Sequence, residues 1–223
     1  MRLLWLVVAG PLTDCRKLIA RTFVRYHGHV QTNTVSAKAV RTRAAILERA
    51  VDIASVEGLE GLTIGKLASE LQMSKSGLFA HFGSKQELQL ATLGAAGQRF
   101  YAAVIAPALV EGEGRARLRA YCGGYLDYLE RKVFAGGCFW AGAATEFDDR
   151  PGAVRDAVSA GLMAWLGELE RQAAAAGVED AAELAFELYS LGLGANTCSR
   201  LLGDERAFER ARNAIEQRLS ELP

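Results

Sequence analysis

The sequence predicts an all-α protein. Apolar residues recur at the three- and four-residue spacing of a helix in one segment after another between Arg41 and Leu219. No segment shows the alternating pattern of a half-buried strand, and the chain contains no internal repeat. With 50% hydrophobic residues among 223, the chain can bury a sizeable core in one or two domains.

The first predicted helix covers residues 41–57, RTRAAILERAVDIASVE. The segment Gly58-Leu59-Glu60-Gly61 ends it. We expect this helix to form a small core with two short helices that follow. Its apolar positions share one face: Ile46, Leu47, Ala50, Val51 and Ala54.

Residues 62–88, LTIGKLASELQMSKSGLFAHFGSKQEL, are the most informative stretch. Thr63 can cap a helix whose apolar positions recur at helical spacing from Ile64 to Leu71. Gln72-Met73-Ser74 interrupts this pattern, and Ser74 can cap a second helix of about two turns. Two short helices joined by a tight turn are the layout of a helix-turn-helix, whose second helix enters the DNA major groove.

The second helix, residues 74–82, has two unlike faces. Leu78 and Phe82 lie four residues apart and pin it to a core, and we assign Phe79 to packing as well. The small and polar side chains of the other face let the helix backbone approach a groove wall. These residues are Lys75, Ser76, Gly77, Ala80 and His81.

The next helix begins at a capping box, Ser84-Lys85-Gln86-Glu87. Lys85 lies in its first turn, where free N–H groups and the helix dipole favour an anion such as a DNA phosphate. Helical patterns then continue to the end of the chain. The predicted helices are 86–109, 115–134, 138–147, 151–176, 181–202 and a last one that ends at Leu219.

The run from about Val40 to Phe100 resembles the N-terminal domain of the TetR family of transcriptional regulators. The resemblance implies a helix-turn-helix DNA-binding domain at 38–84 and a helical effector-binding and dimerisation domain at 85–223. In one departure, position 79 is usually a tyrosine whose hydroxyl reaches a phosphate, and Phe79 lacks that hydroxyl. The matching residues are Ala45-Ile46-Leu47, Ala50, Gly58, Gly61-Leu62-Thr63, Ile64, Leu67-Ala68, Ser74, Gly77-Leu78-Phe79, His81-Phe82, Lys85 and Leu88.

The resemblance also implies roles for single residues in binding double-stranded operator DNA. Thr63, His81 and Lys85 correspond to residues that meet phosphates. The recognition helix, Ser74 to Phe82, supplies base contacts, and basic residues before it can reach the adjacent minor groove or phosphates. The predicted DNA-binding residues are Thr63, Ser74, Lys75, Ser76, Gly77, His81, Lys85, Arg41 and Arg43.

Aromatic and sulfur-containing residues gather in the middle of the chain, where members of the family commonly bind a small effector. Aromatic residues at helical spacing can equally be ordinary core, and the sequence leaves both readings open. Gly142, Ala143 and Ala144 leave space beside Trp140. The predicted effector pocket comprises Phe100, Tyr121, Tyr125, Phe139, Trp140, Phe147, Met163 and Trp165.

The last two predicted helices suggest a homodimer. The penultimate one is rich in alanine and glycine, and small residues permit close helix–helix approach. In TetR-like proteins the two final helices pair with their copies as a four-helix interface; an alanine-rich monomer core is the alternative. A dimer would set two recognition helices about one DNA turn (~34 Å) apart, as a palindrome requires.

Net charge is zero, but the charge is unevenly distributed. Residues 1–37 hold five Lys or Arg and one Asp, and residues 38–85 hold seven Lys or Arg and five Asp or Glu. Residues 86–223 hold fourteen basic and twenty acidic residues. The positive charge therefore lies toward the predicted DNA-binding end, and a dimer would pool the phosphate contacts.

Other chemistry has little support. The four cysteines, Cys15, Cys122, Cys138 and Cys198, show no zinc or disulfide spacing, and we expect no metal and no cofactor. Phe147-Asp148-Asp149-Arg150-Pro151 is predicted to be a turn between helices.

Two rival classes of function stay open. One is a helical binding protein that has lost DNA binding. The other is an enzyme, for which Glu146 is the best candidate acid or base, although its position beside Phe147 indicates a helix-end charge just as well.

Residues 1–37 form an N-terminal extension. The apolar run Leu3–Ala9 is too short to span a bilayer and makes a weak signal peptide, so we expect a cytoplasmic protein without a membrane partner. Our hypothesis is that the natural chain starts at Val35, through an alternative start codon. The alternative is a basic arm; the intact mass of the native protein decides between them.

The sequence therefore predicts a homodimeric, effector-responsive transcriptional regulator. We expect a repressor that binds a pseudo-palindromic operator and responds to an unknown small molecule.

Overall fold

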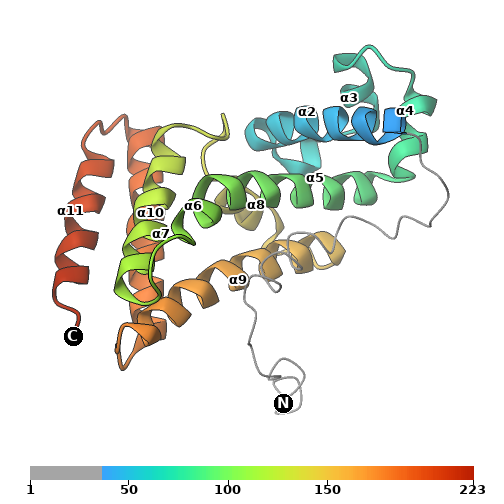
Figure 1. Cartoon of the computed structure of the whole chain (residues 1–223). Coiled ribbons are helices and arrows are strands. Elements are labelled where there is room, and N and C mark those ends of the chain that lie inside the picture. Colours follow the sequence, from blue (N-terminus) through green and yellow to red (C-terminus); the bar gives the residue numbers. More distant parts are fainter. Residues whose placement is uncertain (1–36) are drawn as a thin grey trace.

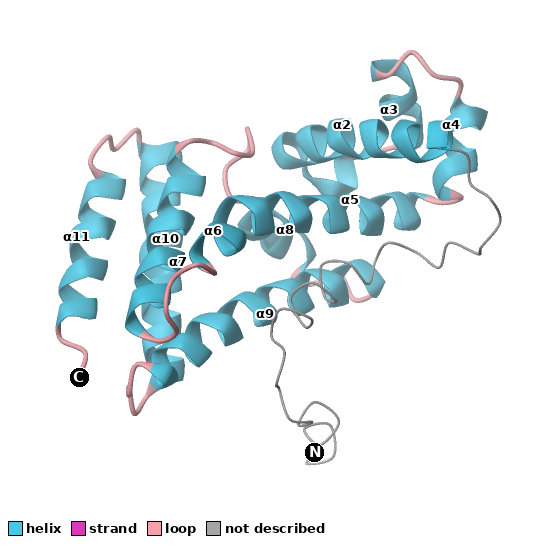
Figure 2. Cartoon of the chain, viewed as in Figure 1, coloured by secondary structure: helices cyan, strands magenta, loops and turns pink. Residues whose placement is uncertain are grey.

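The computed structural model describes residues 37–223, and in this range every regular element is a helix (Figures 1 and 2). The predicted all-α class is confirmed for that part of the chain. The hypothesis on residues 1–34 and the apolar run Leu3–Ala9 lie outside the described residues. Among the described helices, none is both long and apolar enough to cross a membrane.

The N-terminal part consists of α2 (Ala37–Gly61), α3 (Ile64–Glu70) and α4 (Lys75–Phe82). The predicted caps are confirmed: the hydroxyl of Thr63 accepts a hydrogen bond from the Lys66 amide, and that of Ser74 accepts one from the Gly77 amide. Helix α2 begins four residues earlier than Arg41. The three helices contribute fully buried side chains to one core: Ile46, Ala50 and Val51 from α2, Leu67 from α3 and Leu78 from α4.

Helix α2 is interrupted at Gly58, whose backbone has φ 80° and ψ 163°. This region of the Ramachandran map is open to glycine almost alone, which explains why a glycine stands here. The chain changes direction at Gly58, and residues 59–61 form a separate last turn.

Helix α5 (Lys85–Phe100) continues through a π-helical turn (Tyr101–Ile105) into α6 (Ala106–Ala108). The whole stretch corresponds to the single helix predicted at 86–109. In the π turn the Ala106 amide donates to the Tyr101 carbonyl five residues back. Pro107 follows and has no N–H of its own, so the ordinary four-residue ladder cannot continue through it.

The C-terminal part contains α7 (Arg115–Glu130), α8 (Phe139–Phe147), α9 (Ala153–Ala175), α10 (Ala181–Leu202) and α11 (Ala207–Ser220). Helix α10 matches its predicted bounds, with the Asp180 side chain capping one end and left-handed Gly203 (φ 68°) the other. Helix α7 ends four residues before the predicted Phe134, since Lys132 takes a positive φ of 52°. Helix α9 begins two residues after Pro151, not at it.

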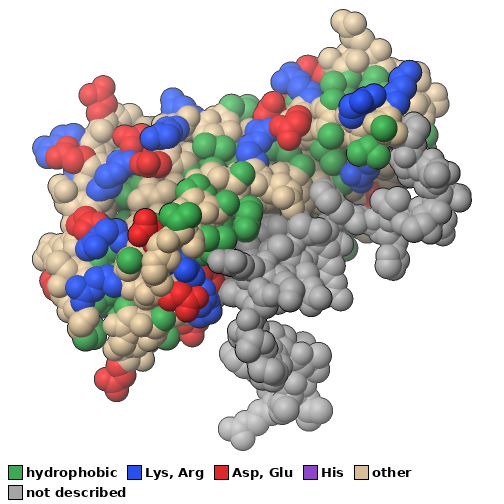
Figure 3. All heavy atoms as spheres, in the orientation of Figure 1, with side chains coloured by type: hydrophobic (Ala, Val, Ile, Leu, Met, Phe, Trp, Pro, Cys, Tyr) green, Lys and Arg blue, Asp and Glu red, His purple; other side chains and the backbone are tan. Residues whose placement is uncertain are grey.

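The helices form an elongated molecule with α3 and α4 at one end and α10 and α11 at the other (Figure 1). Helix α5 and its continuation into α6 run along the middle and link the two ends. On the face shown in Figure 3, acidic and basic side chains are mixed at the end of the molecule that holds α7 and α11, while basic side chains are prominent at the α3–α4 end.

Candidate functional site

The exposed face of the second helix of the helix-turn-helix carries small or polar side chains with one exception. Lys75, Ser76 and Ala80 are exposed, while Leu78 and Phe82 are buried on the opposite side. The exception is Phe79, which is 52% exposed, so its assignment to packing is wrong. Phe79 follows Leu78 directly, and a step of one residue turns a side chain about 100° away from the core-facing stripe. The face therefore carries an aromatic side chain beside the polar ones.

The hydroxyls of Thr63 and Ser74, both predicted to bind DNA, are engaged locally. Thr63 Oγ1 accepts from the Lys66 amide at 3.1 Å, and Ser74 Oγ accepts from the Gly77 amide at 3.1 Å. Ser84 Oγ likewise accepts from the Glu87 amide at 3.1 Å. Ser74 Oγ also lies 3.3 Å from Ser76 Oγ, and either can be the donor. An accepting hydroxyl keeps its own proton, so capping by Thr63 and a phosphate contact are compatible.

Two of the predicted basic contacts differ in their surroundings. Arg41 is exposed, whereas the Arg43 guanidinium lies 4.9 Å from the centre of the Phe82 ring. Burial lowers the pKa of Arg43, and Glu87 acts in the opposite direction. His81 is half-buried at the end of α4, with its ring 6.3 Å from that of Phe82.

Lys85 is not a free cation. Its Nζ lies 2.8 Å from Oε2 of Glu60, in the last turn of α2. Gln89 donates to the other Glu60 oxygen at 3.0 Å and to the Leu59 carbonyl at 2.9 Å. The hydrogen bonds from Lys85 and then Gln89 hold the pKa of Glu60 below its ordinary value. The residue predicted to bind a phosphate therefore already has an anionic partner.

Glu146 of α8 binds the backbone of the same turn. Its Oε2 accepts from the Leu59 amide at 2.7 Å, and its Oε1 accepts from the Glu60 amide at 2.8 Å. These N–H groups open a new turn after Gly58 and would otherwise have no helical partner. Its geometry is that of a carboxylate that caps a helix turn. The sequence left open a helix-end charge or a catalytic acid or base for Glu146, and it did not indicate this contact with residues 59 and 60.

Four of the predicted effector-pocket aromatics form a packed cluster. Phe100, Tyr125, Trp140 and Trp165 surround a cavity of only about 10 Å³, which has room for little more than one water molecule. The Phe100 ring lies 5.3 Å from the Trp165 ring and 6.4 Å from the Tyr125 ring, in edge-to-face arrangements. In this conformation the aromatic residues fill the centre of the C-terminal part.

The other predicted pocket residues lie apart from that cavity. Tyr121 is buried and touches the Trp165 ring at 5.7 Å, while its hydroxyl points to a polar network. Phe147 is buried at the end of α8 beneath Arg150. Met163 is 62% exposed on α9 and does not line the cavity inside the aromatic cluster. Phe139 lies next to Trp140 and lines a different, open cleft.

That open cleft, which we call the junction cleft, has a volume of about 710 Å³. It lies where the end of α2, the loop at Gly136, helix α8 and helix α10 meet. Cys138 and Tyr189 border both the junction cleft and the packed aromatic cluster. Its other lining residues are mostly small, among them Ala54, Ala141, Gly142, Ala143 and Ala144. The only sequence feature that pointed to the junction cleft was the space expected around Gly142.

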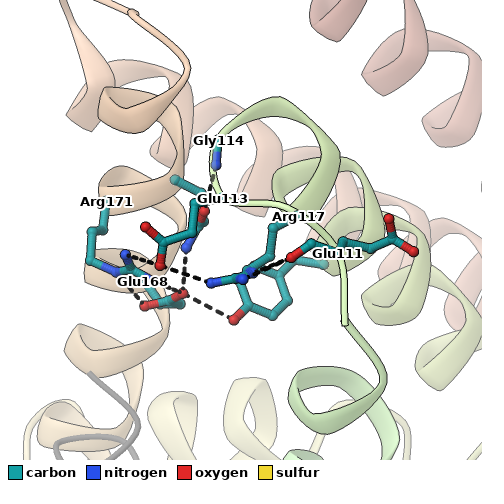
Figure 4. A network of polar contacts seen from close by, with 8 residues as sticks. Glu111, Glu113, Gly114, Arg117, Glu168 and Arg171 are labelled. Atoms are coloured by element: carbon teal, nitrogen blue, oxygen red, sulfur yellow. Dashed lines mark hydrogen bonds and ion pairs between the residues drawn. The ribbon is translucent and has the colours of Figure 1, made fainter. Parts of the chain in front are cut away.

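A second polar network lies inside the C-terminal part (Figure 4). Glu168 of α9 is 1% exposed and accepts from the Tyr121 hydroxyl, from Arg171 and from Gln172 at 2.9–3.0 Å. Gln172 in turn accepts from the Gly114 amide at the start of α7. Burial, with a smaller contribution from Glu168, raises the pKa of Tyr121, so its hydroxyl remains a donor. The network fastens α7 to α9.

Helices α10 and α11 present an apolar surface. Phe186, Leu201 and Leu202 are each more than 60% exposed, although all three are large and hydrophobic. A groove of about 770 Å³ runs between the two helices, and small residues such as Gly194, Ala195 and Ala211 line it. Among the described residues, no group of three or more His, Cys, Asp or Glu could hold a metal ion.

A helix-turn-helix at one end and an all-helical, cleft-bearing domain at the other define a DNA-binding transcriptional regulator. Comparison with known proteins agrees. The family model for bacterial regulatory proteins of the tetR family matches residues 46–92, and that for the tetracyclin repressor-like C-terminal domain matches 114–215. The chain belongs to the TetR family. A search of curated protein sequences gives no match.

Solved structures show the same fold. A TetR-family regulator from Streptomyces coelicolor is 26% identical, with a TM-score of 0.71 and coverage of 81% of this chain and 96% of its own. A TetR regulator from Chloroflexus aurantiacus is 23% identical, with a TM-score of 0.73 and coverage of 84% and 98%. AibR, solved with isovaleryl coenzyme A and operator DNA, is 21% identical, with a TM-score of 0.63 and coverage of 81% and 97%.

Proposed function

We propose that this protein is a homodimeric repressor that binds a pseudo-palindromic operator and leaves it when a small effector binds. The observation that carries the proposal is the exposed face of α4, held rigidly by two buried residues and capped by Ser74. Lys75, Ser76 and Gly77 would approach base edges in the major groove. Thr63, His81 and Lys85 would hold the phosphate backbone, with Arg41 and Arg43 beside them.

The apolar surface of α10 and α11 supports the homodimer. Phe186, Leu201 and Leu202 would be covered by a second copy, and the small residues of the groove let helices approach closely. A two-fold axis through this surface would place two copies of α4 at the opposite end of the molecule, as a palindrome requires.

The C-terminal part supports an effector site. The family binds small molecules there, and AibR was solved with both a coenzyme A ester and its operator. An effector would favour a conformer whose two recognition helices are wrongly spaced for DNA. Thermodynamic linkage requires that DNA weaken effector binding by the same factor. We propose no catalytic role and a cytoplasmic location, where the DNA lies.

The proposal is tested by fluorescence anisotropy of the full chain on DNA from around its own gene. Scrambled competitor is present, and two salt concentrations are compared. We expect tight binding that survives the competitor and weakens with salt. Binding that the competitor abolishes would instead favour a helical binding protein that has lost DNA recognition. The ion pair of Lys85 with Glu60 and the missing hydroxyl at Phe79 support this second candidate.

Lys85→Ala tests the phosphate contact in the same assay. We expect weaker binding to every DNA sequence and a salt slope that is shallower by about two, one phosphate for each protomer of a dimer. Lys132→Ala, an exposed lysine after α7, is the control and should leave the slope unchanged. An unchanged slope in Lys85→Ala would count against the contact.

A further inference from the structure

We propose that the junction cleft binds a small amphiphile with an ammonium group, and that Glu146 transmits this binding to the DNA-binding helices. The second part, transmission to the DNA-binding helices, rests on the proposed function, because it identifies the class and the site of the effector. It places the effector beside the aromatic cluster, at the junction of α2, α8 and α10, and not inside the cluster.

The size of the two cavities favours the junction cleft. Small-molecule sites commonly enclose about 300–1,000 Å³. The junction cleft, with about 710 Å³, lies within this range, whereas the cavity inside the aromatic cluster holds about 10 Å³. Small side chains from α2 and α8 form much of its wall, so an apolar body fits against them. A ligand there can be accommodated without unpacking the buried rings.

The charges on the wall favour a cation. Glu57 and Glu146 line the junction cleft, and no lysine or arginine stands among the described residues that line it. Glu57 pairs with Lys66 on its other side. Lys66 therefore offsets much of the Glu57 charge, whereas no ion pair is formed by Glu146 among the described residues. An anionic ligand would be repelled chiefly by Glu146, and a cationic ligand would be attracted to it.

A buried acceptor points to a ligand that donates hydrogen bonds. Asn196 of α10 lines the junction cleft and is only 9% exposed, yet its Oδ1 has no hydrogen-bond partner. A buried acceptor without a partner is costly and rare in native proteins. An ammonium group has three N–H donors and no acceptor, so it can serve Asn196 and a carboxylate together. A carboxylate ligand can serve neither.

Glu146 connects the junction cleft to the DNA-binding helices. Its two oxygens are the acceptors for the amides of Leu59 and Glu60, directly after the break at Gly58. An ammonium group that draws on either oxygen competes with one of these amides. The last turn of α2 then loses part of what holds it against α8.

The last turn of α2 carries the partner of Lys85. Glu60 pairs with Lys85 at 2.8 Å and accepts from Gln89 at 3.0 Å, both on the first turns of α5. A shift of Glu60 therefore moves or releases the lysine that we assign to a DNA phosphate. Two direct contacts and one turn of backbone thus join the junction cleft to the DNA-binding surface, and the coupling acts in both directions.

Calorimetry on the full chain without DNA tests the ligand class. The probes are 4-phenylbutylamine, 4-phenylbutanol and 4-phenylbutanoate, which share a body and differ in the head group. We expect the amine to bind most tightly and the carboxylate at least about tenfold more weakly, the effect of one ionic hydrogen bond. Equal binding of the three, or tighter binding of the carboxylate, would overturn the assignment.

A pair of glycine substitutions tests the location. Gly142→Leu adds a side chain to the wall of the junction cleft, where a Cβ at Gly142 meets no atom within 4 Å. Gly123→Leu is the matched control, on an exposed helical position of α7 with equally open space. We expect the first to abolish amine binding and the second to leave it unchanged. Unchanged binding in Gly142→Leu would place the ligand elsewhere.

Glu146→Gln tests the transmission, with exposed Glu170→Gln of α9 as control. In wild type the amine should weaken DNA binding measured by anisotropy. Glu146→Gln should lose the preference for amine over alcohol and lose this response, whereas Glu170→Gln should keep both. A full response in Glu146→Gln would overturn the role of Glu146. If the wild-type chain shows no sequence-specific DNA binding, the proposed function fails. Calorimetry still decides which class of ligand binds and whether it binds in the junction cleft.

Discussion

Two carboxylates of the C-terminal part, Glu168 and Glu146, have opposite kinds of surroundings. Glu168 is 1% exposed, and its partners among the described residues are side chains of α7 and α9 (Figure 4). Glu146 is half-buried, lines an open cleft, and binds two backbone amides of α2, 86 and 87 residues away in sequence.

This difference suits Glu168 to a role in stability and Glu146 to a role in regulation. Among the described residues, each oxygen of Glu168 has partners on α7 or α9 and no described cavity adjoins it, so these contacts hold α7 and α9 together. The contact of Glu146 is open on one side, and a ligand can compete for it. A regulator needs both a rigid domain that keeps it folded and a contact that is weak enough for a ligand to change it. We call the contacts of Glu146 with residues 59 and 60, and of Glu60 with Lys85 and Gln89, the joint.

The largest effect is expected from Glu168→Ala. It leaves Tyr121 and Gln172 without their acceptor and removes a partner of Arg171. Loss of one member of a buried ionic group costs about 3–5 kcal/mol, and we expect about 3 because Arg171 is 31% exposed and can turn to water. The melting temperature should fall by roughly 6–12 °C.

Urea unfolding measures this loss, with Glu170→Ala on the same helix as the control. Amine binding in the junction cleft should survive in the folded fraction, because the network does not reach α8. A loss below about 1 kcal/mol would mean that the network adds little to stability.

Gly58→Ala is expected to disrupt the contact of Glu146 with the last turn of α2. Alanine is strained at φ 80°, and its Cβ would lie 2.6 Å from Oε1 of Glu146, so the carboxylate must leave the Leu59 and Glu60 amides. We expect a loss of about 2 kcal/mol in the free energy of unfolding, within the range for such backbone strain. The DNA response to the amine should disappear.

Gly203→Ala is the matched control, since Gly203 has φ 68° at the end of α10 and open space around it. It should lose stability through strain alone and keep the response to the amine. If both variants keep the response, the path through Glu146 is wrong.

Glu60→Gln tests the next contact of the joint and should have a smaller effect. It removes the anionic partner of Lys85 and one negative charge near the DNA. Exposed ion pairs contribute about 0.2–1 kcal/mol, so we expect DNA affinity at low salt to rise by up to about fivefold. Glu216→Gln, which breaks the exposed pair with Arg119, should leave DNA affinity unchanged. Reduced DNA affinity in Glu60→Gln would mean that Glu60 positions Lys85 for the phosphate.

Local signals in the sequence predicted the helices well. Thr63, Ser74 and Asp180 cap helices through hydrogen bonds that span three residues, and Gly203 ends α10 through its own backbone freedom. Such features need no knowledge of the rest of the chain. The errors at the end of α7 and at Phe79 are local in origin: Lys132 takes a positive φ, and Phe79 lies one helical step away from the buried Leu78.

The candidate site was less predictable, because its contacts join residues that are distant in sequence. Nothing local to Glu146 indicates that it meets residues 59 and 60, and nothing local to Lys85 reveals its pair with Glu60. Aromatic residues such as Phe100 and Trp165 can fill a cavity or line one, and only packing decides which. The junction cleft is lined largely by alanine and glycine, whose side chains carry no chemical signal in a sequence.

The smallest effect concerns the pH dependence of the joint. The hydrogen bonds from Lys85 and Gln89 hold the pKa of Glu60 below its ordinary value of 4.5. A lowered pKa in the folded state means that the stabilisation is present above pH 4.5 and is lost as the pH falls through the lowered value. The free energies of unfolding of wild type and Glu60→Gln should therefore differ slightly at pH 6 and converge toward pH 3. A difference that stays constant over this range would show that the Glu60 charge contributes nothing to holding the last turn of α2 on α5, and the joint would then depend on Glu146 and Gln89 alone.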